Sequence, residues 1–129
     1  MGKLPKPLFV VVGLTLAACS GFQLDRAQGV TPRGSAFDTA LYGGYLELSR
    51  VEFAEGDFAD SDFFALRAIQ SGTGGGVGPQ EIGGRLLPDN MIPEFASARR
   101  KLTAVLEDTA SQKAPEAAAR AQVMFDCWM

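Results

Sequence analysis

The stretch Tyr45-Leu46-Glu47-Leu48-Ser49-Arg50-Val51-Glu52-Phe53-Ala54-Glu55-Gly56-Asp57-Phe58 combines a helical pattern with a helix stop and a new start. From Leu41 onward, apolar side chains recur three or four positions apart, the spacing of one face of an amphipathic helix. Gly56 suits a left-handed helix end, and Asp57 can cap the following helix. We therefore predict two antiparallel helices joined by a short turn, the first beginning at Ser35 or Asp38.

Both helices of this hairpin have side chains that we expect to face a core. The first contributes Leu41, Tyr45, Leu48, Val51 or Glu52, and Phe53, and the second contributes Phe58, Phe63 or Phe64, Ala65, Ala68 and Ile69. The hairpin resembles one tetratricopeptide repeat, with Tyr45, Leu48, Ser49, the Gly56-Asp57-Phe58 turn, Ser61 and Ala68 at repeat positions and departures at Glu52 and Ala65. A single repeat cannot bury its own face, so this one must pack on other helices.

Two further helices are predicted toward the C-terminus, each with a proline in its first turn. The third helix runs from Ile92 to Ala110, and the fourth begins at Pro115 and continues through Trp128. The apolar stripe expected to bind the third helix to the core is Ile92, Phe95, Ala98, Leu102, Val105, Leu106 and Thr109. The predicted fold class is all-α, a small antiparallel bundle of about four helices that forms one helical domain over residues 36–129.

Residues 71–90 are predicted to be a Gly-rich, flexible connector between the two pairs of helices. Five of the nine residues from Ser71 to Pro79 are glycine. No Gly-Lys-Ser/Thr follows, so the stretch lacks the motif of a phosphate-binding loop. Leu86-Leu87-Pro88 are expected to pin the far end of the connector to the body.

Residues 1–18 have the features of a signal peptide. Lys3 and Lys6 precede an 11-residue apolar run, residues 8–18, which is too short to span a bilayer because spanning takes about 20 residues. A short buried N-terminal helix is the alternative. Leu16-Ala17-Ala18-Cys19 resembles a bacterial lipobox, which implies cleavage between Ala18 and Cys19, a diacylglycerol thioether on Cys19 and acylation of the new amino terminus with chains such as palmitate.

Residues 19–35 are expected to form a lipidated, flexible tether, because Gly21, Gly29, Pro32 and Gly34 interrupt any helix. Ser20 follows the cysteine where an aspartate would favour retention in the inner membrane of enteric-type bacteria. The sequence thus favours the outer membrane, facing the periplasm, while sorting to the inner membrane stays an alternative.

The composition of the chain excludes several classes of catalysis, metal site and partner. The chain has 12 basic and 15 acidic side chains and no histidine. Histidine-dependent catalysis and most zinc sites are therefore excluded, and we expect no cofactor and no metal. The acidic balance argues against nucleic acid as a partner. The only basic cluster, Arg99-Arg100-Lys101, is interpreted as a solvated helix face rather than a phosphate site.

Carboxylates gather around the predicted turn, at Glu52, Glu55, Asp57, Asp60 and Asp62. Such a density could hold Ca²⁺, but the stretch lacks the glycine and the closing glutamate of a calcium loop. A solvated hairpin end is the favoured interpretation. A carboxylate-dependent envelope enzyme using Glu52 or Asp57 is a less favoured alternative, because no pair of acids is singled out.

Beyond the lipobox, the Tyr45–Ile69 hairpin, the run Ile82–Leu87 and the segment Ala114–Met129 resemble the N-terminal region of alphaproteobacterial OmpA-family lipoproteins. In that family a helical region precedes a C-terminal domain that binds peptidoglycan. This sequence ends before such a domain, so we expect no direct binding to peptidoglycan. A second cysteine of the family pattern is also missing, which implies that Cys127 is a free thiol or forms an intermolecular bond.

The favoured function is a non-enzymatic, lipid-anchored helical interaction module of the cell envelope, with a membrane and an envelope protein as partners. The alternative is a truncated remnant of a peptidoglycan-associated lipoprotein without an independent role. Phe125 and Trp128 are interpreted as core, or as an exposed association patch if the fourth helix has lost a neighbour.

Overall fold

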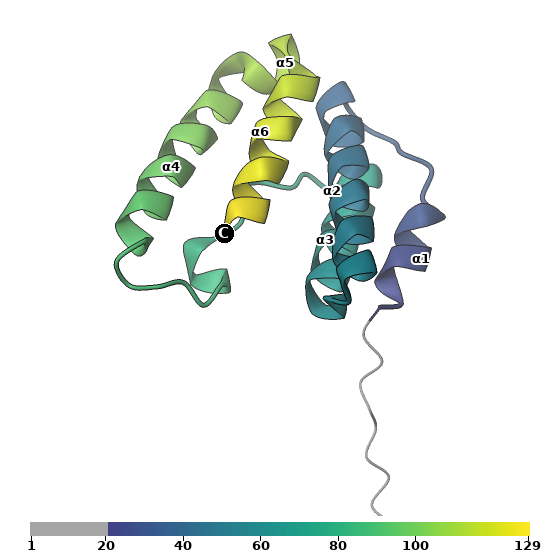
Figure 1. The fold of residues 1–129 in the computed structure, drawn as a ribbon. Helices are drawn as coiled ribbons and strands as arrows, with labels where there is room; N and C mark the ends of the chain where they lie inside the picture. Colours follow the sequence, from purple (N-terminus) through teal and green to yellow (C-terminus); the bar gives the residue numbers. More distant parts are fainter. Residues whose placement is uncertain (1–20) are drawn as a thin grey trace, which may run out of the picture.

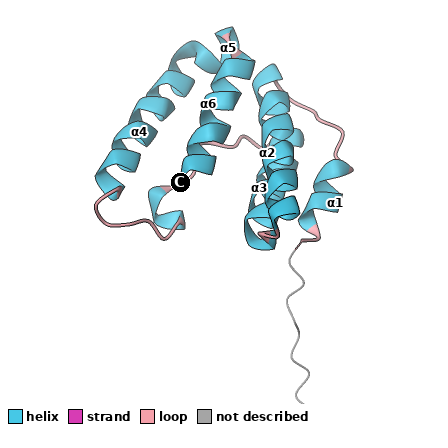
Figure 2. Ribbon diagram, viewed as in Figure 1, coloured by secondary structure: helices cyan, strands magenta, loops and turns pink. Residues whose placement is uncertain are grey.

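The computed structural model describes residues 21–129, and this part of the chain is all-helical, as predicted (Figures 1 and 2). The helices are α1 (Gln23–Gln28), α2 (Ala36–Glu55), α3 (Phe58–Gly72), α4 (Ile92–Val105), α5 (Ser111–Lys113) and α6 (Pro115–Trp128). A 3-10 turn, η1 (Ile82–Gly84), interrupts the long loop, and a π-helical turn, η2 (Leu106–Ala110), follows α4. The four predicted helices correspond to α2, α3, α4 and α6.

The ends of α2 form where the sequence places them. Ser35 Oγ accepts a hydrogen bond from the Asp38 amide at 3.0 Å, and the Asp38 carboxylate accepts one from the Ser35 amide at 3.1 Å. This reciprocal pair satisfies two amides that have no partner within the helix. At the other end Gly56 has a φ of 85°, a left-handed conformation that side chains disfavour. Asp57 then caps α3 by accepting from the Asp60 amide at 3.0 Å.

Helices α2 and α3 pack closely because small side chains face each other between them. The Ser49 hydroxyl donates to the Ser61 carbonyl oxygen at 2.7 Å, and both serines are fully buried. The buried apolar residues of the hairpin are Leu41, Tyr45, Leu46, Leu48, Phe64, Ala65 and Ala68. The prediction was wrong for Phe53, Phe58 and the Val51 alternative, which are exposed. Val51 lines an open groove shared with α6, and Phe53 and Phe58 lie beside the turn with one side open to solvent.

Helix α6 covers a second face of α2 and completes the core with Ala119 and Val123 (Figure 1). Gly44 makes this approach possible. A Cβ atom added at Gly44 would lie 2.9 Å from Val123 Cγ2, too close for an ordinary contact, whereas one added at the neighbouring Gly43 would meet nothing within 4 Å. Packing against Val123 therefore requires a glycine at position 44, whereas position 43 has room for a side chain.

Helix α1 corrects the prediction of a flexible tether over residues 19–35, as far as the described residues reach. It fits between the predicted breakers Gly21 and Gly29 and buries Leu24 and Ala27 against the α2–α3 hairpin. The Tyr42 hydroxyl donates to the carbonyl oxygens of Ala27 and Val30, at 3.0 and 3.1 Å. Gly21 and Gly29 thus lie on either side of a short helix, and contacts with the hairpin stabilise that helix.

The loop after α3 also differs from the predicted flexible connector. Helix α3 continues through Gly72, and the loop then runs against α6 with Val77 and Gln80 buried. The Gln122 side-chain amide donates to the Val77 carbonyl oxygen at 2.7 Å, which fixes the middle of the loop. Leu86 is fully exposed, so the expectation that it pins the loop to the body is wrong.

Helix α4 lies at the outside of the bundle, next to α6 (Figure 1). Of its predicted apolar stripe only Phe95 is buried, while Ile92 and Val105 are exposed. The stripe faces α6 and the loop over part of its length only, because α6 packs mainly against α2. The period of the pattern correctly predicts the helix but overestimates how much of it is covered.

The predicted signal peptide, cleavage site and lipid attachment site fall within residues 1–20, which lie outside the described residues. Within residues 21–129, no helix combines the length and the apolar character needed to cross a bilayer.

Candidate functional site

The described chain begins two residues after Cys19, at Gly21, and this first residue is already fixed to the body. The Asp62 carboxylate of α3 accepts hydrogen bonds from the Gly21 amide at 2.8 Å and from the Gln23 amide at 3.0 Å. One carboxylate therefore attaches the start of the body to the hairpin. Ala18 and Cys19 themselves, the predicted cleavage and lipidation residues, lie outside the described part.

Aromatic side chains surround this starting point. A Cβ atom added at Gly21 would lie 3.3 Å from the Phe53 ring and 3.5 Å from the Phe58 ring, so both rings lie against the backbone of Gly21. Phe53 and Phe58 contact each other edge to face, with centroids 5.2 Å apart. Both remain 42% exposed, and Phe22 is 60% exposed. The end of the hairpin beside Gly21 therefore presents exposed aromatic side chains to solvent.

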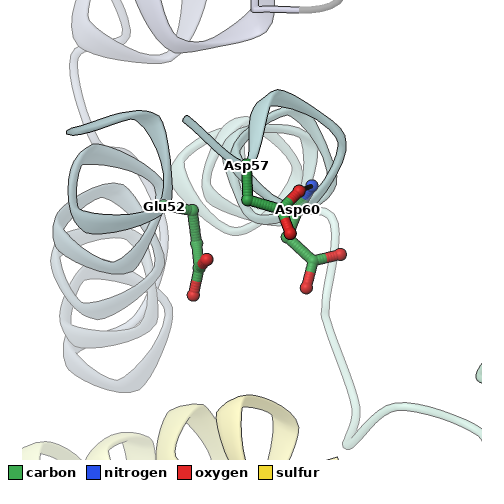
Figure 3. Close-up of side chains that lie close together, drawn as sticks. All are labelled: Glu52, Asp57 and Asp60. Carbon is green, nitrogen blue, oxygen red and sulfur yellow. Dashed lines mark hydrogen bonds between the residues drawn. The ribbon is translucent and has the colours of Figure 1, made fainter. Parts of the chain in front are cut away.

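The predicted acidic cluster forms at the same end of the hairpin. Carboxylate oxygens of Glu52, Asp57 and Asp60 lie within 4.8 Å of one another, with Glu52 on the last turn of α2 and the aspartates at the start of α3 (Figure 3). Partial burial, followed by repulsion from Asp60, Glu55 and Asp57, raises the pKa of Glu52 above its ordinary value.

Two of these three acids have structural partners. Asp57 caps α3, and both carboxylate oxygens of Asp60 accept from Nη1 of Arg85, at 2.6 and 2.8 Å. Arg85 already offsets part of the negative charge that would attract a cation. The geometry gathers three of the predicted acidic residues at the end of the hairpin, with Arg85 beside them.

A second charged cluster, which the sequence analysis missed, is enclosed between α2, α3, α6 and the loop. Asp126 is fully buried on α6 and forms an ion pair with Arg67 at 2.7 Å. Its carboxylate also accepts from the Tyr45 hydroxyl at 2.6 Å and from the Gln80 amide at 2.8 Å. Gln122 donates to the Tyr45 oxygen at 3.0 Å and completes what we call the Asp126 network: Asp126, Arg67, Tyr45, Gln80 and Gln122.

The Asp126 network is suited to holding elements together rather than to chemistry. Burial, followed by the negative charge of Asp126, raises the pKa of Tyr45 far above its ordinary value, so the phenol keeps its proton. The Arg67 side chain is only 16% exposed and lies over the Tyr45 ring, at 4.9 Å from the centroid. The network joins α2, α3, α6 and the loop through one buried carboxylate, so it is interpreted as structural.

Cys127 is exposed near the C-terminal end of α6 and forms no disulfide within residues 21–129. Partial desolvation, followed by the negative charge of Glu52, raises the pKa of its thiol above the ordinary value. A raised pKa disfavours the thiolate, which is the nucleophilic form. The raised pKa disfavours Cys127 as a nucleophile, and its exposure leaves an intermolecular bond sterically possible.

Phe125 and Trp128 were interpreted either as core residues or as an exposed association patch, and the two side chains differ in this respect. Phe125 is buried, whereas Trp128 is about half exposed. The Trp128 ring contacts Phe95 of α4, with centroids 4.4 Å apart, and Phe125 at 6.3 Å. This aromatic group is the main apolar contact between α4 and α6.

An open groove of about 530 Å³ lies between α2 and α6. Its lining includes Gly43, Leu48, Val123 and Met124, together with charged side chains from Glu47, Glu116 and Arg120. The sequence analysis missed this groove because it depends on the packing of two helices that are far apart in the chain.

A partial signal for the Asp126 network was present in the sequence. Asp126 interrupts an apolar end of α6, and Arg67 stands among apolar residues of α3. Such isolated charges can also face solvent, so only the packing shows that they meet. Comparisons of the chain with protein-family models, with curated proteins and with solved structures found no match.

Proposed function

We propose that this chain is a lipid-anchored, non-enzymatic helical interaction module of a bacterial cell envelope, attached through Cys19 to the outer membrane and facing the periplasm. The observation that carries the proposal is the order of features in residues 1–19. Two lysines precede an apolar run too short to span, and two alanines precede a cysteine. Acylation of that cysteine would leave the helical body at the membrane surface.

The position of the folded body supports the proposal. The described residues begin at Gly21, two residues after Cys19, so processing before Cys19 would leave every described helix in place. The side chains beyond residue 18 include ten basic and 15 acidic groups, because Lys3 and Lys6 are two of the 12 basic residues. A short lipidated segment joined to an acidic helical body is consistent with a protein held at the surface of a membrane.

The interaction role is supported by the groove between α2 and α6. Its apolar and charged lining residues suit side chains of a protein partner, since protein interfaces combine apolar and polar contacts. An envelope protein is therefore the partner that we propose.

The test compares two cysteine variants in a bacterial host that processes lipoproteins. We expect Cys19→Ser to abolish incorporation of labelled palmitate, to block cleavage of the precursor and to prevent maturation into the membrane-bound form. Cys127→Ser is the matched control, and it should be labelled and processed like the unchanged chain. If the Cys19→Ser chain still carries palmitate and sediments with membranes at the mature size, the proposal is wrong.

A further inference from the structure

Three exposed phenylalanines lie around the first described residue, at the end of the hairpin where α2 turns into α3. They are Phe22, Phe53 and Phe58, and Phe53 and Phe58 lie against the backbone of Gly21. The start of α1 lies beside the α2–α3 turn, so these rings come from three segments that meet at one end of the molecule (Figure 1). We call this surface the phenylalanine end.

The chain length between the lipid site and this surface is short. Cys19 and Gly21 are separated by two peptide units, which span at most about 7 Å. Gly21 cannot swing away from the hairpin without losing its hydrogen bond to Asp62, and Gln23 is held by the same carboxylate. A lipid on Cys19 would therefore hold the start of the phenylalanine end within about 7 Å of the lipidated residue, next to the bilayer surface.

Burial of the three rings at that surface is favourable, because apolar side chains at a membrane interface enter about 5–10 Å into the headgroup boundary. Charge decides which lipids suit the contact. Glu55 and Asp57 are exposed at the same end, and Glu52 lies beside them, whereas the nearby Arg85 is paired with Asp60. These carboxylates would be repelled by an anionic surface and tolerated by a zwitterionic one.

We propose that the phenylalanine end is a membrane-contact surface that inserts Phe22, Phe53 and Phe58 into the headgroup region of a zwitterionic bilayer and fixes the orientation of the body. The inference rests on the proposed anchoring through Cys19. Helix α2 has 20 residues and is about 30 Å long. Helix α5 lies at its other end and would therefore point away from the membrane, which leaves the α2–α6 groove accessible from the side (Figure 1).

The test places a fluorescent probe at each end of the lipidated protein. A Cys127→Ser background removes the free thiol, and the probe is attached at Ala54→Cys on the phenylalanine end or at Gln112→Cys on α5, both exposed positions. The protein is reconstituted into vesicles of phosphatidylethanolamine and phosphatidylcholine that contain a headgroup spin label. We expect the probe at position 54 to be quenched at least about twofold more than the probe at position 112, given the depth of interfacial insertion.

Two matched variants and a change of lipid sharpen the result. Phe53→Ser with Phe58→Ser should remove most of the difference between the probes, whereas Val105→Ser with Met124→Ser, also exposed apolar positions, should preserve it. Anionic phosphatidylglycerol should reduce the difference.

Each unfavourable outcome has its own meaning, because the lipid on Cys19 is measured separately by mass. Equal quenching at the two positions on a lipidated chain would overturn the membrane-contact surface alone. A difference that survives the phenylalanine substitutions would overturn it as well. A chain recovered without lipid would overturn the anchoring, and this inference with it.

Discussion

The part of the molecule built from α2, α3 and α6 and the arm built from α4, η2 and α5 are both helical, but they are held by different means. The first part shares a continuous apolar core and the Asp126 network. The arm contributes one buried apolar side chain, Phe95, and leaves Val105 57% exposed. The difference teaches that an amphipathic pattern specifies a helix, whereas burial depends on how many neighbours the helix finds.

The arm is attached mainly through polar contacts with the loop. Arg99 donates to the carbonyl oxygens of Gln80 and Pro79, at 2.9 and 3.1 Å, and also contacts Glu81. Gln80 in turn donates its amide to Asp126. The loop therefore connects the arm to the Asp126 network. Removing Asp126 or Arg99, which lie on the two sides of this connection, should affect the stability of the two regions differently.

The largest effect is expected from Asp126→Ala. This change leaves Arg67 with an unpaired charge and deprives the Tyr45 hydroxyl and the Gln80 amide of their acceptor. Breaking a buried pair in this way should lower the free energy of unfolding by about 3–5 kcal/mol. Chemical denaturation measures the change. Asp108→Ala on the exposed face of η2 is the control, with an expected effect within about 0.5 kcal/mol. Similar values for the two variants would remove the distinction between the regions.

An intermediate effect is expected at the contact between α2 and α6. Gly44→Ala forces a Cβ atom to within 2.9 Å of Val123, and such overpacking should cost about 1–3 kcal/mol. Gly43→Ala meets nothing within 4 Å and should stabilise α2 by about 0.5–1 kcal/mol through the higher helix propensity of alanine. Thermal and chemical unfolding of the pair would show opposite signs. A stabilising Gly44→Ala would mean that α6 does not pack on α2 at this point.

The smallest global effect is expected from Arg99→Ala, which cuts the bonds between α4 and the loop. Because the arm adds little to the core, the free energy of global unfolding should change by less than about 1 kcal/mol, the scale of a single hydrogen bond. Amide hydrogen exchange should nevertheless become faster in α4 and stay unchanged in α2 and α3. Arg100→Ala, exposed on the same helix, serves as control. Faster exchange throughout the molecule would show that the arm and the core unfold as one unit.

Much of the helical framework could be predicted from local signals. Ser35 and Asp38, Gly56, Asp57 and the two first-turn prolines mark helix ends through bonds between neighbours in the sequence. Such signals work because their partners lie within a few residues. For the same reason, the acidic character of the hairpin end was foreseen, since its aspartates and glutamates are neighbours along the chain.

Features that depend on distant contacts could not be predicted. Helix α1 is stabilised by Tyr42 and Asp62, and the Gly-rich loop is fixed by Gln122, which lies 45 residues after Val77. The Asp126 network joins residues from position 45 to position 126, and no local pattern reveals that they meet. Phe53 and Phe58 are exposed because they lie at the end of the bundle, which their periodic spacing in the sequence does not reveal.

The central claim, that Cys19 carries the lipid that places this body on a membrane, is tested most directly at the N-terminus of the mature protein. The protein would be extracted from bacterial membranes with detergent, and its N-terminal peptide would be analysed by mass spectrometry. The account predicts a peptide that begins at Cys19 and carries a diacylglycerol thioether together with an amide-linked acyl chain. A peptide that begins upstream of Cys19, or an unmodified Cys19, would contradict it.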